Sequence, residues 1–225
     1  MAHVLDRAIF HALMTRQSGF AEGTGKARRF LSDVEPFAAS ADDSPEALAD
    51  LARLVPEQGM IVTLQVGHQT VPDGITAAGE VQGVQMVAVD LKPPGESPDV
   101  IELGNADAAD MLALAELTKP GPFLPRTHLL GGFVGIRREG RLVAMAGERL
   151  KLPGYTEVSG VCTHSDYRGN GYASLLSTIV AGRIKARGET PILHAFASNT
   201  AAISVYERLG FQLRAMVVGL MLKRS

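Results

Sequence analysis

The residues in this sequence that most clearly indicate a binding or catalytic site form a glycine-containing turn, Tyr167-Arg168-Gly169-Asn170-Gly171-Tyr172-Ala173. Apolar residues recur after Gly171 at helical spacing, so the turn directly precedes a predicted helix. The first backbone N–H groups of a helix lack partners within it and lie at the positive end of its dipole. Glycine lets an anion approach those groups closely. The turn therefore predicts a site for an anion such as a pyrophosphate, with an ordinary tight turn as the alternative.

Two other phosphate-binding motifs fit this turn less well. A Walker loop needs Gly-Lys-Ser/Thr after four spacer residues, and the dinucleotide fingerprint needs a third glycine where Ser174 stands. A nucleotide-binding enzyme that uses the turn for ATP or NAD is thus a rival interpretation, disfavoured by the missing lysine and ribose-binding acid.

A second motif follows the turn at a distance of about twenty-five residues. The stretch from Val161 to Ala173, followed by Asn199 to Phe211, resembles the paired acetyl-CoA signatures of the GNAT superfamily of N-acetyltransferases. The resemblance extends over residues 107–224 and implies an α/β GNAT fold with a mixed sheet. We therefore expect two parts: an N-terminal α/β region of unclear role (1–100), readable as a degenerate GNAT-like half, and a GNAT domain (101–225).

The resemblance implies how acetyl-CoA, the expected cosubstrate, is bound. Arg168, Gly171 and Ala173 fill the specified positions of the family's Arg/Gln-x-x-Gly-x-Gly/Ala loop, which cradles the CoA pyrophosphate. The end of the preceding strand would pair with the pantetheine arm as if the arm were another strand. The expected cofactor-binding residues are Val161, Cys162, Thr163, Arg168, Gly169, Asn170, Gly171, Tyr172, Ala173 and Asn199.

Tyr206 is the expected catalytic acid, since the family implies a phenol that protonates the departing thiolate. It lies seven residues after Asn199, so a helix beginning there places both on one face with Ala202 between them. Two alternatives stay open. Asn199 is also a favoured N-cap, and Tyr206 could be a core aromatic residue.

An attacking amine must lose a proton, so a base is expected as well. Glu157 is the first candidate because it lies on the strand that leads to the glycine turn, where several family members use a glutamate. Glu148 is the second candidate, and His164 is the third because its ordinary pKa suits proton transfer. A solvated charge at a strand end is the alternative for each.

The segment 120–130 is the expected substrate-facing loop. Phe123, Arg126 and His128 offer an apolar surface, a fork for a carboxylate and a hydrogen-bonding group. Arg126 could instead tie down a proline-rich loop. The only cysteine, Cys162, is interpreted as a buried hydrophobe and not as a nucleophile, and the six histidines show no metal-ligand spacing, so no metal is expected.

The elements that position these residues follow from periodicity and punctuation. In the first half we predict helices over 4–14 and 44–54, strands over 60–66 and 82–89, a linker over 90–97, and no clear pattern over 19–40. In the second half we predict a helix from Asp107 to Leu117, hairpin strands over 133–137 and 141–147, a strand over 156–163, a helix over 172–187, a strand over 192–197, a helix from Asn199 to Leu209 and a strand over 212–223.

Composition bounds the remaining possibilities. The 225 residues are 46% hydrophobic with a net charge of −2, which fits one large domain or two small ones and gives no basic field for nucleic acid. The apolar run 215–222 is too short for a membrane span. Asp6 and Arg7 interrupt the apolar core that a secretion signal needs. A single cysteine is compatible with the reducing cytoplasm. We expect a small-molecule or peptide amine as partner, no nucleic acid and no membrane, with a homodimer left open.

Together these features predict an acyltransferase that moves an acetyl group from acetyl-CoA to a primary amine by direct transfer in a ternary complex. Positioning the amine beside the thioester would supply most of the catalysis. The alternative is a noncatalytic acyl-CoA-binding sensor or scaffold module.

Overall fold

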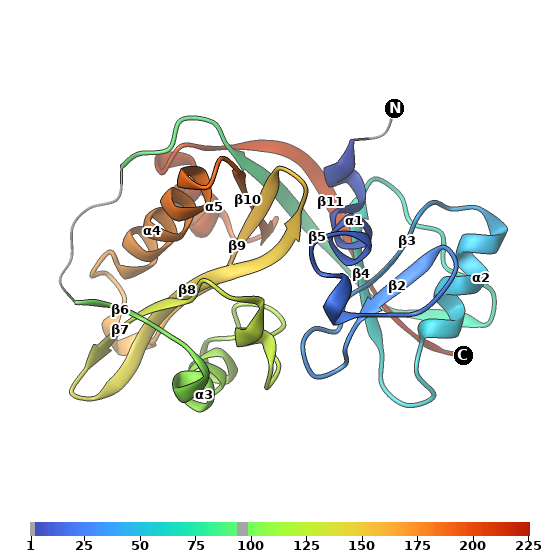
Figure 1. Cartoon of the computed structure of the whole chain (residues 1–225), viewed down its shortest axis with the longest axis horizontal. Helices are drawn as coiled ribbons and strands as arrows, with labels where there is room; N and C mark the ends of the chain where they lie inside the picture. The colour runs from blue at the N-terminus through green and yellow to red at the C-terminus, as the bar shows by residue number, and fades with distance from the viewer. Residues whose placement is uncertain (1–2, 94–98) are drawn as a thin grey trace.

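A computed structural model describes residues 3–93 and 99–225, and its main feature is a mixed eight-stranded sheet (Figure 1). In spatial order, the strands are β4 (Ile61–Val66), β11 (Phe211–Arg224), β5 (Ile75–Ala88), β10 (Thr190–Phe196), β9 (Tyr155–Thr163), β8 (Arg141–Leu152), β7 (Val134–Arg138) and β6 (Val100–Glu102). Only β9 and β10 pair in parallel; the other neighbours in this sheet are antiparallel.

Strands from both halves of the chain share this sheet. Strand β5 lies between β10 and β11, and β11 continues across to β4. Figure 1 shows β5 and β11 as the long strands that connect the two ends of the molecule. The division at residue 100 stays a prediction, but the two parts are joined by backbone hydrogen bonds.

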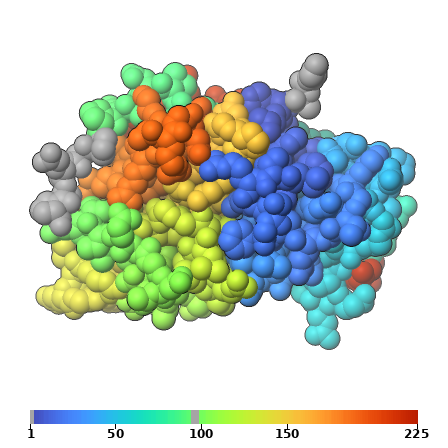
Figure 2. All heavy atoms as spheres, viewed as in Figure 1, coloured from blue at the N-terminus to red at the C-terminus, as the bar shows by residue number. Residues whose placement is uncertain are grey.

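The part of the chain before the gap, residues 3–93, is called the first segment, and it also forms a small sheet of its own. Its strands are β1 (Ala21–Glu22), β2 (Ala27–Phe30) and β3 (Ala38–Ser40), which are accompanied by helices α1 (Ala8–Met14) and α2 (Pro45–Leu54). Ser44 caps α2 by accepting from the backbone N–H of Ala47, and Pro45 occupies the first turn. Figure 2 shows this segment packed directly against the part that contains β8.

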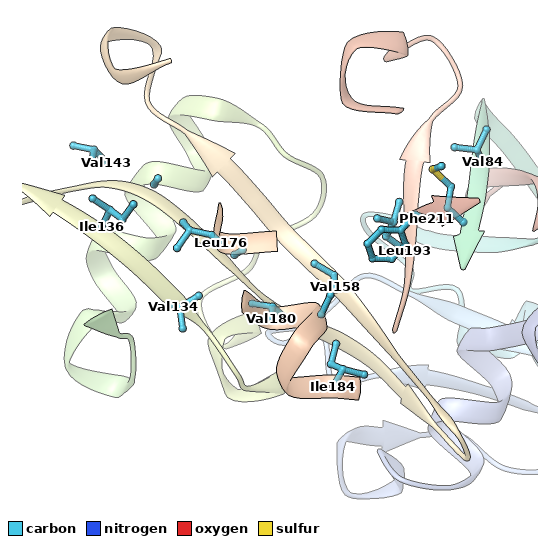
Figure 3. Packing of buried hydrophobic residues seen from close by; sticks show 14 residues of the cluster. Val84, Val134, Ile136, Val143, Val158, Leu176, Val180, Ile184, Leu193 and Phe211 are labelled. Carbon is cyan, nitrogen blue, oxygen red and sulfur yellow. The ribbon is translucent and has the colours of Figure 1, made fainter. Parts of the chain in front are cut away.

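Helix α4 (Tyr172–Ala186) supports the glycine turn because its apolar side is anchored in the main core. Leu176, Val180 and Ile184 are fully buried against Val134, Val158 and other side chains of the sheet (Figure 3). Helix α3 (Ala108–Thr118) belongs to another cluster, in which Met111 and Leu114 pack with Met145 and Cys162. Helix α5 (Thr200–Arg208) leads into β11.

Most predicted elements are confirmed, apart from several strands. The strand predicted over 82–89 begins at Ile75, because its largely exposed first half pairs with the end of β11. The strand predicted over 141–147 continues to Leu152 because it stays paired with β9, and the short strand β6 was not predicted. The segment 19–40 holds three short strands whose lengths are too small to show a period. Of the predicted linker over 90–97, positions 94–97 lie outside the described residues.

Two further findings concern the described residues alone. No helix among them is long and apolar enough to cross a membrane. Within residues 3–93 and 99–225, no cluster of three or more histidine, cysteine or acidic side chains is arranged to hold a metal ion.

Candidate active site

The candidate site begins where two parallel strands separate. Strand β10 pairs with β9 only from Thr190 to Ile192, opposite Tyr155 to Glu157. Beyond this point β10 stays paired with β5 on its other edge, from Ile192 to Phe196, while the end of β9 stays paired with β8. A cleft of about 430 Å³ lies between the separated ends.

The glycine turn forms one end of this cleft. Gly171 is the N-cap of α4 with φ 75°, and Gly169 has φ 84°, so both adopt the left-handed backbone that favours glycine. Apart from the adjacent residues of the chain, no atom lies within 4 Å of the position that a Cβ would take at either glycine, so the space beside them is open. Arg168, Tyr172 and Ala173 also line the cleft. Asn170 is not among the lining residues and donates its side-chain N–H to the carbonyl of Tyr167 at 3.0 Å.

The end of β9 forms the second wall. Val161, Cys162 and Thr163 all line the cleft. The hydroxyl oxygen of Thr163 is buried and has no hydrogen-bond partner among the described residues. Burial raises the pKa of the Cys162 thiol to about 11, so the thiol stays protonated at neutral pH and is a poor nucleophile.

Helix α5 supplies the third wall. Asn199, Ala202 and Tyr206 lie along the side of the helix that faces the cleft, as their spacing predicts. The Asn199 side-chain oxygen accepts from the backbone N–H of Ala202 at 3.1 Å, so this residue caps the helix as well. Burial raises the pKa of Tyr206 to about 12, and its ring packs edge-on against Phe211 at 6.2 Å.

Glu157 is completely buried and does not itself line the cleft. Two nitrogens of Arg149 donate to its carboxylate at 2.9 and 2.6 Å, and His194 Nδ1 lies 2.8 Å from Oε1. Burial would raise the pKa of this carboxyl, but attraction to Arg149 and His194 outweighs burial and holds the pKa well below its usual range. The carboxylate thus reaches the cleft only through His194.

The sequence did not predict that His194 lies at the wall of the cleft. It lies on β10 after the strands have separated, and it lines the cleft. The pairing of Ile192 with Glu157 places the two strands in the register that brings His194 to the carboxylate. A histidine within an apolar strand was the available signal, but its partner depends on pairing between residues 37 positions apart.

The other two candidate bases lie elsewhere. Glu148 is buried beneath Lys151 at 2.9 Å and Arg187 at 2.8 Å, and it is not a lining residue of the cleft. His164 is buried, and its Nδ1 accepts from the backbone N–H of Asp166 at 3.2 Å, which caps a short turn before Arg168.

The three predicted substrate-binding residues do not line the cleft. Phe123 packs edge-on against Phe133, Arg126 binds Asp33 at 3.0 Å, and His128 Nε2 lies 3.1 Å from the side-chain oxygen of Asn105. The beginning of the same loop does reach the cleft, through Lys119 and Pro120.

The structure thus defines an α/β protein with a mixed sheet, in which a cleft between separated parallel strands ends at a glycine turn and a helix start. Comparison with known proteins agrees with this class. The family model of FR47-like proteins matches residues 133–218. A solved GNAT-family protein from Novosphingobium aromaticivorans is 39% identical, with 100% of both chains covered and a TM-score of 0.94. The chain belongs to the GNAT family.

Two more distant relatives were also found. A GCN5-related N-acetyltransferase from Kribbella flavida shares the fold at 22% identity, with 98% of this chain and 96% of that chain covered and a TM-score of 0.66. The mycothiol acetyltransferase of Streptomyces avermitilis is 29% identical over 153 residues, which is 66% of this chain and 46% of that protein. The chain thus spans about half the length of this curated relative.

Proposed function

We propose that the protein transfers an acetyl group from acetyl-CoA to a primary amine by direct attack in a ternary complex. The observation that carries this proposal is the cleft between β9 and β10, because the glycine turn at the start of α4 and Tyr206 of α5 both line it. Membership of the GNAT family supports it, and so do relatives that are named acetyltransferases.

Two features of the cleft fit acetyl-CoA. The backbone N–H groups around Gly169 and Gly171 would hold the pyrophosphate. The backbone of Val161 to Thr163 would bind the pantetheine amides, since β10 no longer pairs with β9 there.

Acetyl-CoA supplies the thioester, and the residues of the chain orient it and move protons. The amine nitrogen forms a bond to the acyl carbon while the carbon–sulfur bond breaks. Tyr206 donates its phenolic proton to the sulfur and regains one from the nitrogen, so the products are an amide and free CoA. The raised pKa of Tyr206 keeps this proton in place at neutral pH. A backbone N–H near Val161 would stabilise charge on the carbonyl oxygen.

Glu157 enters this proposal as a positioning residue. Its carboxylate fixes His194 at the wall of the cleft, and Arg149 fixes the carboxylate. Glu148 contacts two cations outside the cleft and has no role in the proposed reaction. We also propose that the first segment completes the domain predicted over 101–225, since β5 flanks β10.

Thermal unfolding with and without acetyl-CoA tests the binding step. Acetyl-CoA at about 100-fold above its Kd would add about 2.7 kcal/mol and raise Tm by several degrees. Absence of a shift with acetyl-CoA and with longer acyl-CoAs would refute the proposal.

Thiol release with a panel of amines tests the transfer step. We expect Tyr206→Phe to lower kcat by about 100-fold or more while the Tm shift with acetyl-CoA survives. Tyr155→Phe is the matched control, because Tyr155 lies at the start of β9, whereas the cleft is lined by the end of that strand, Val161 to Thr163. Binding of acetyl-CoA without thiol release from any amine would favour the noncatalytic sensor.

A further inference from the structure

A second cavity of about 210 Å³ adjoins the cleft. The two cavities share four lining residues, Pro120, His194, Ala195 and Phe196, so the end of β10 is a wall common to both. A ligand in the second cavity would therefore meet the acyl end of acetyl-CoA across His194. The cavity is smaller than the roughly 300 Å³ at which pockets for drug-sized ligands begin, so it suits a small molecule and not a peptide.

Apolar side chains form most of this cavity, and many come from the first segment. The main ones are Phe37, Val62, Leu64, Val81, Val217 and Met221. One wall of the cavity therefore comes from β4, β5 and Phe37, the residue before β3. None of these lies in the GNAT motifs of the second half of the chain. The first segment therefore supplies a large share of the apolar surface of this cavity.

The charged group at this cavity is already neutralised. Arg149 is the charged member among the described lining residues, and its guanidinium donates twice to Glu157 while it stacks on Phe37 at 4.9 Å. An acceptor with its own charge would lose hydration here without finding an unpaired opposite charge.

Neighbouring side chains lie within hydrogen-bond distance of both ring nitrogens of His194. Arg214 donates to the side-chain oxygen of Gln85 at 2.7 Å, and the Gln85 nitrogen donates to the carbonyl of Leu5 at 2.9 Å. This fixes the amide, so its other N–H points to His194 Nε2 at 2.9 Å, and Nδ1–H donates to Glu157. Both ring nitrogens of His194 are thus engaged by neighbouring side chains, so neither is free to contact an ammonium group in the cavity.

From these contacts we propose that the second cavity binds the acceptor and that this acceptor is a small apolar amine that enters uncharged, an arylamine being the best-fitting class. This inference rests on the proposed acetyl transfer. The neutral nitrogen forms the new bond to the acyl carbon as the bond to sulfur breaks, and the displaced nitrogen proton ends on the CoA sulfur. Recognition comes from burial of the ring and not from ion pairing.

Three matched acceptors test the proposal with the wild-type protein and acetyl-CoA. The first is 4-methylaniline. The second is 4-aminobenzoate, in which a carboxylate replaces the methyl group, and the third is 4-methylbenzylamine, which is cationic at neutral pH. We expect kcat/KM for 4-methylaniline to exceed that for 4-aminobenzoate at least tenfold and to stay constant between pH 6.5 and 8.5. For 4-methylbenzylamine, kcat/KM should rise about tenfold per pH unit with the neutral fraction.

Several outcomes would overturn the inference while the proposed function survives. A preference for 4-aminobenzoate would mean that Arg149 binds an acceptor carboxylate. A flat pH profile for 4-methylbenzylamine would mean that the protein removes the proton itself. Transfer to peptides or polar amines alone would place the acceptor outside this cavity. Failure of acetyl-CoA to raise Tm would instead refute the function on which the inference rests.

A pair of variants on β5 tests the location independently of the acceptor panel. Val81→Phe fills the cavity, and Ala78→Phe places the same ring at an exposed position of the same strand. We expect Val81→Phe to raise KM for 4-methylaniline at least tenfold and to leave the Tm shift with acetyl-CoA intact, while Ala78→Phe changes neither. Equal KM values for the two variants would contradict this location.

Discussion

Glu35 gives the sharpest prediction about stability, and Glu35→Gln is the perturbation. This carboxyl is 1% exposed, and neither oxygen has a hydrogen-bond partner among the described residues. Burial raises its pKa from 4.5 to about 8; the nearby Arg149 opposes the rise, and Glu157 adds to it. Glu35 is therefore a neutral acid in the folded protein at neutral pH.

The sign and size of the effect follow from this pKa. The unfolded chain releases the proton near pH 4.5, whereas the folded protein holds it until about pH 8. The stabilising contribution is thus fully present below the unfolded pKa and is lost as the pH rises through the folded pKa. The free energy of unfolding should fall by about 1.4 kcal/mol per pH unit in this window, and by about 3 kcal/mol at pH 7.

Urea unfolding between pH 5.5 and 7.5 provides the measurement. Gln carries no titrating proton, so the free energy of unfolding of Glu35→Gln should fall less steeply with pH than that of the wild type, by about 1.4 kcal/mol per pH unit. Glu116→Gln is the control, because Glu116 is exposed on α3. Parallel pH profiles for Glu35→Gln and the wild type would refute the reasoning.

Four other substitutions address the site and its scaffold, and one of them, Gly188→Ala, is a control. Glu157→Gln should lower the free energy of unfolding by about 3 kcal/mol, measured in urea, because the buried Arg149 loses its counter-charge; an unchanged value would contradict the ion pair. Gly171→Ala should cost about 1 to 2 kcal/mol because φ is 75°, and titration should show weaker acetyl-CoA binding. Gly188→Ala imposes similar strain at the other end of α4, with φ 79°, and should leave that affinity unchanged. Asn199→Ala should cost about 1 kcal/mol through loss of the helix cap, seen as a lower Tm.

Local patterns in the sequence predicted many of the residues that line the cleft between β9 and β10. The glycine turn, the helix that follows it and the spacing of Asn199 from Tyr206 depend on residues close together in the chain. The structure places all of these around one cleft, apart from Asn170, whose side chain is turned back to Tyr167. Periodicity alone determined these elements because each forms from short-range backbone hydrogen bonds and one apolar face.

The positions of the predicted substrate-binding residues and of Glu157 were decided by the tertiary structure. The predicted residues Phe123, Arg126 and His128 found partners outside the cleft, and Glu157 became buried under Arg149. These contacts depend on strand register and on which strands become neighbours, and neither property is encoded in local spacing.

The first hundred residues show most clearly the difference between what local sequence patterns determine and what only the tertiary structure decides. Their sequence determined a capped helix at Pro45–Leu54 and a strand at Ile61–Val66 but gave no function. Only the folded sheet, in which β5 inserts between β10 and β11, brings Val62, Val81 and Phe37 to the wall beside His194. Apolar residues far apart in the chain form one cavity because burial of their shared surface, which is non-directional, stabilises that arrangement of strands.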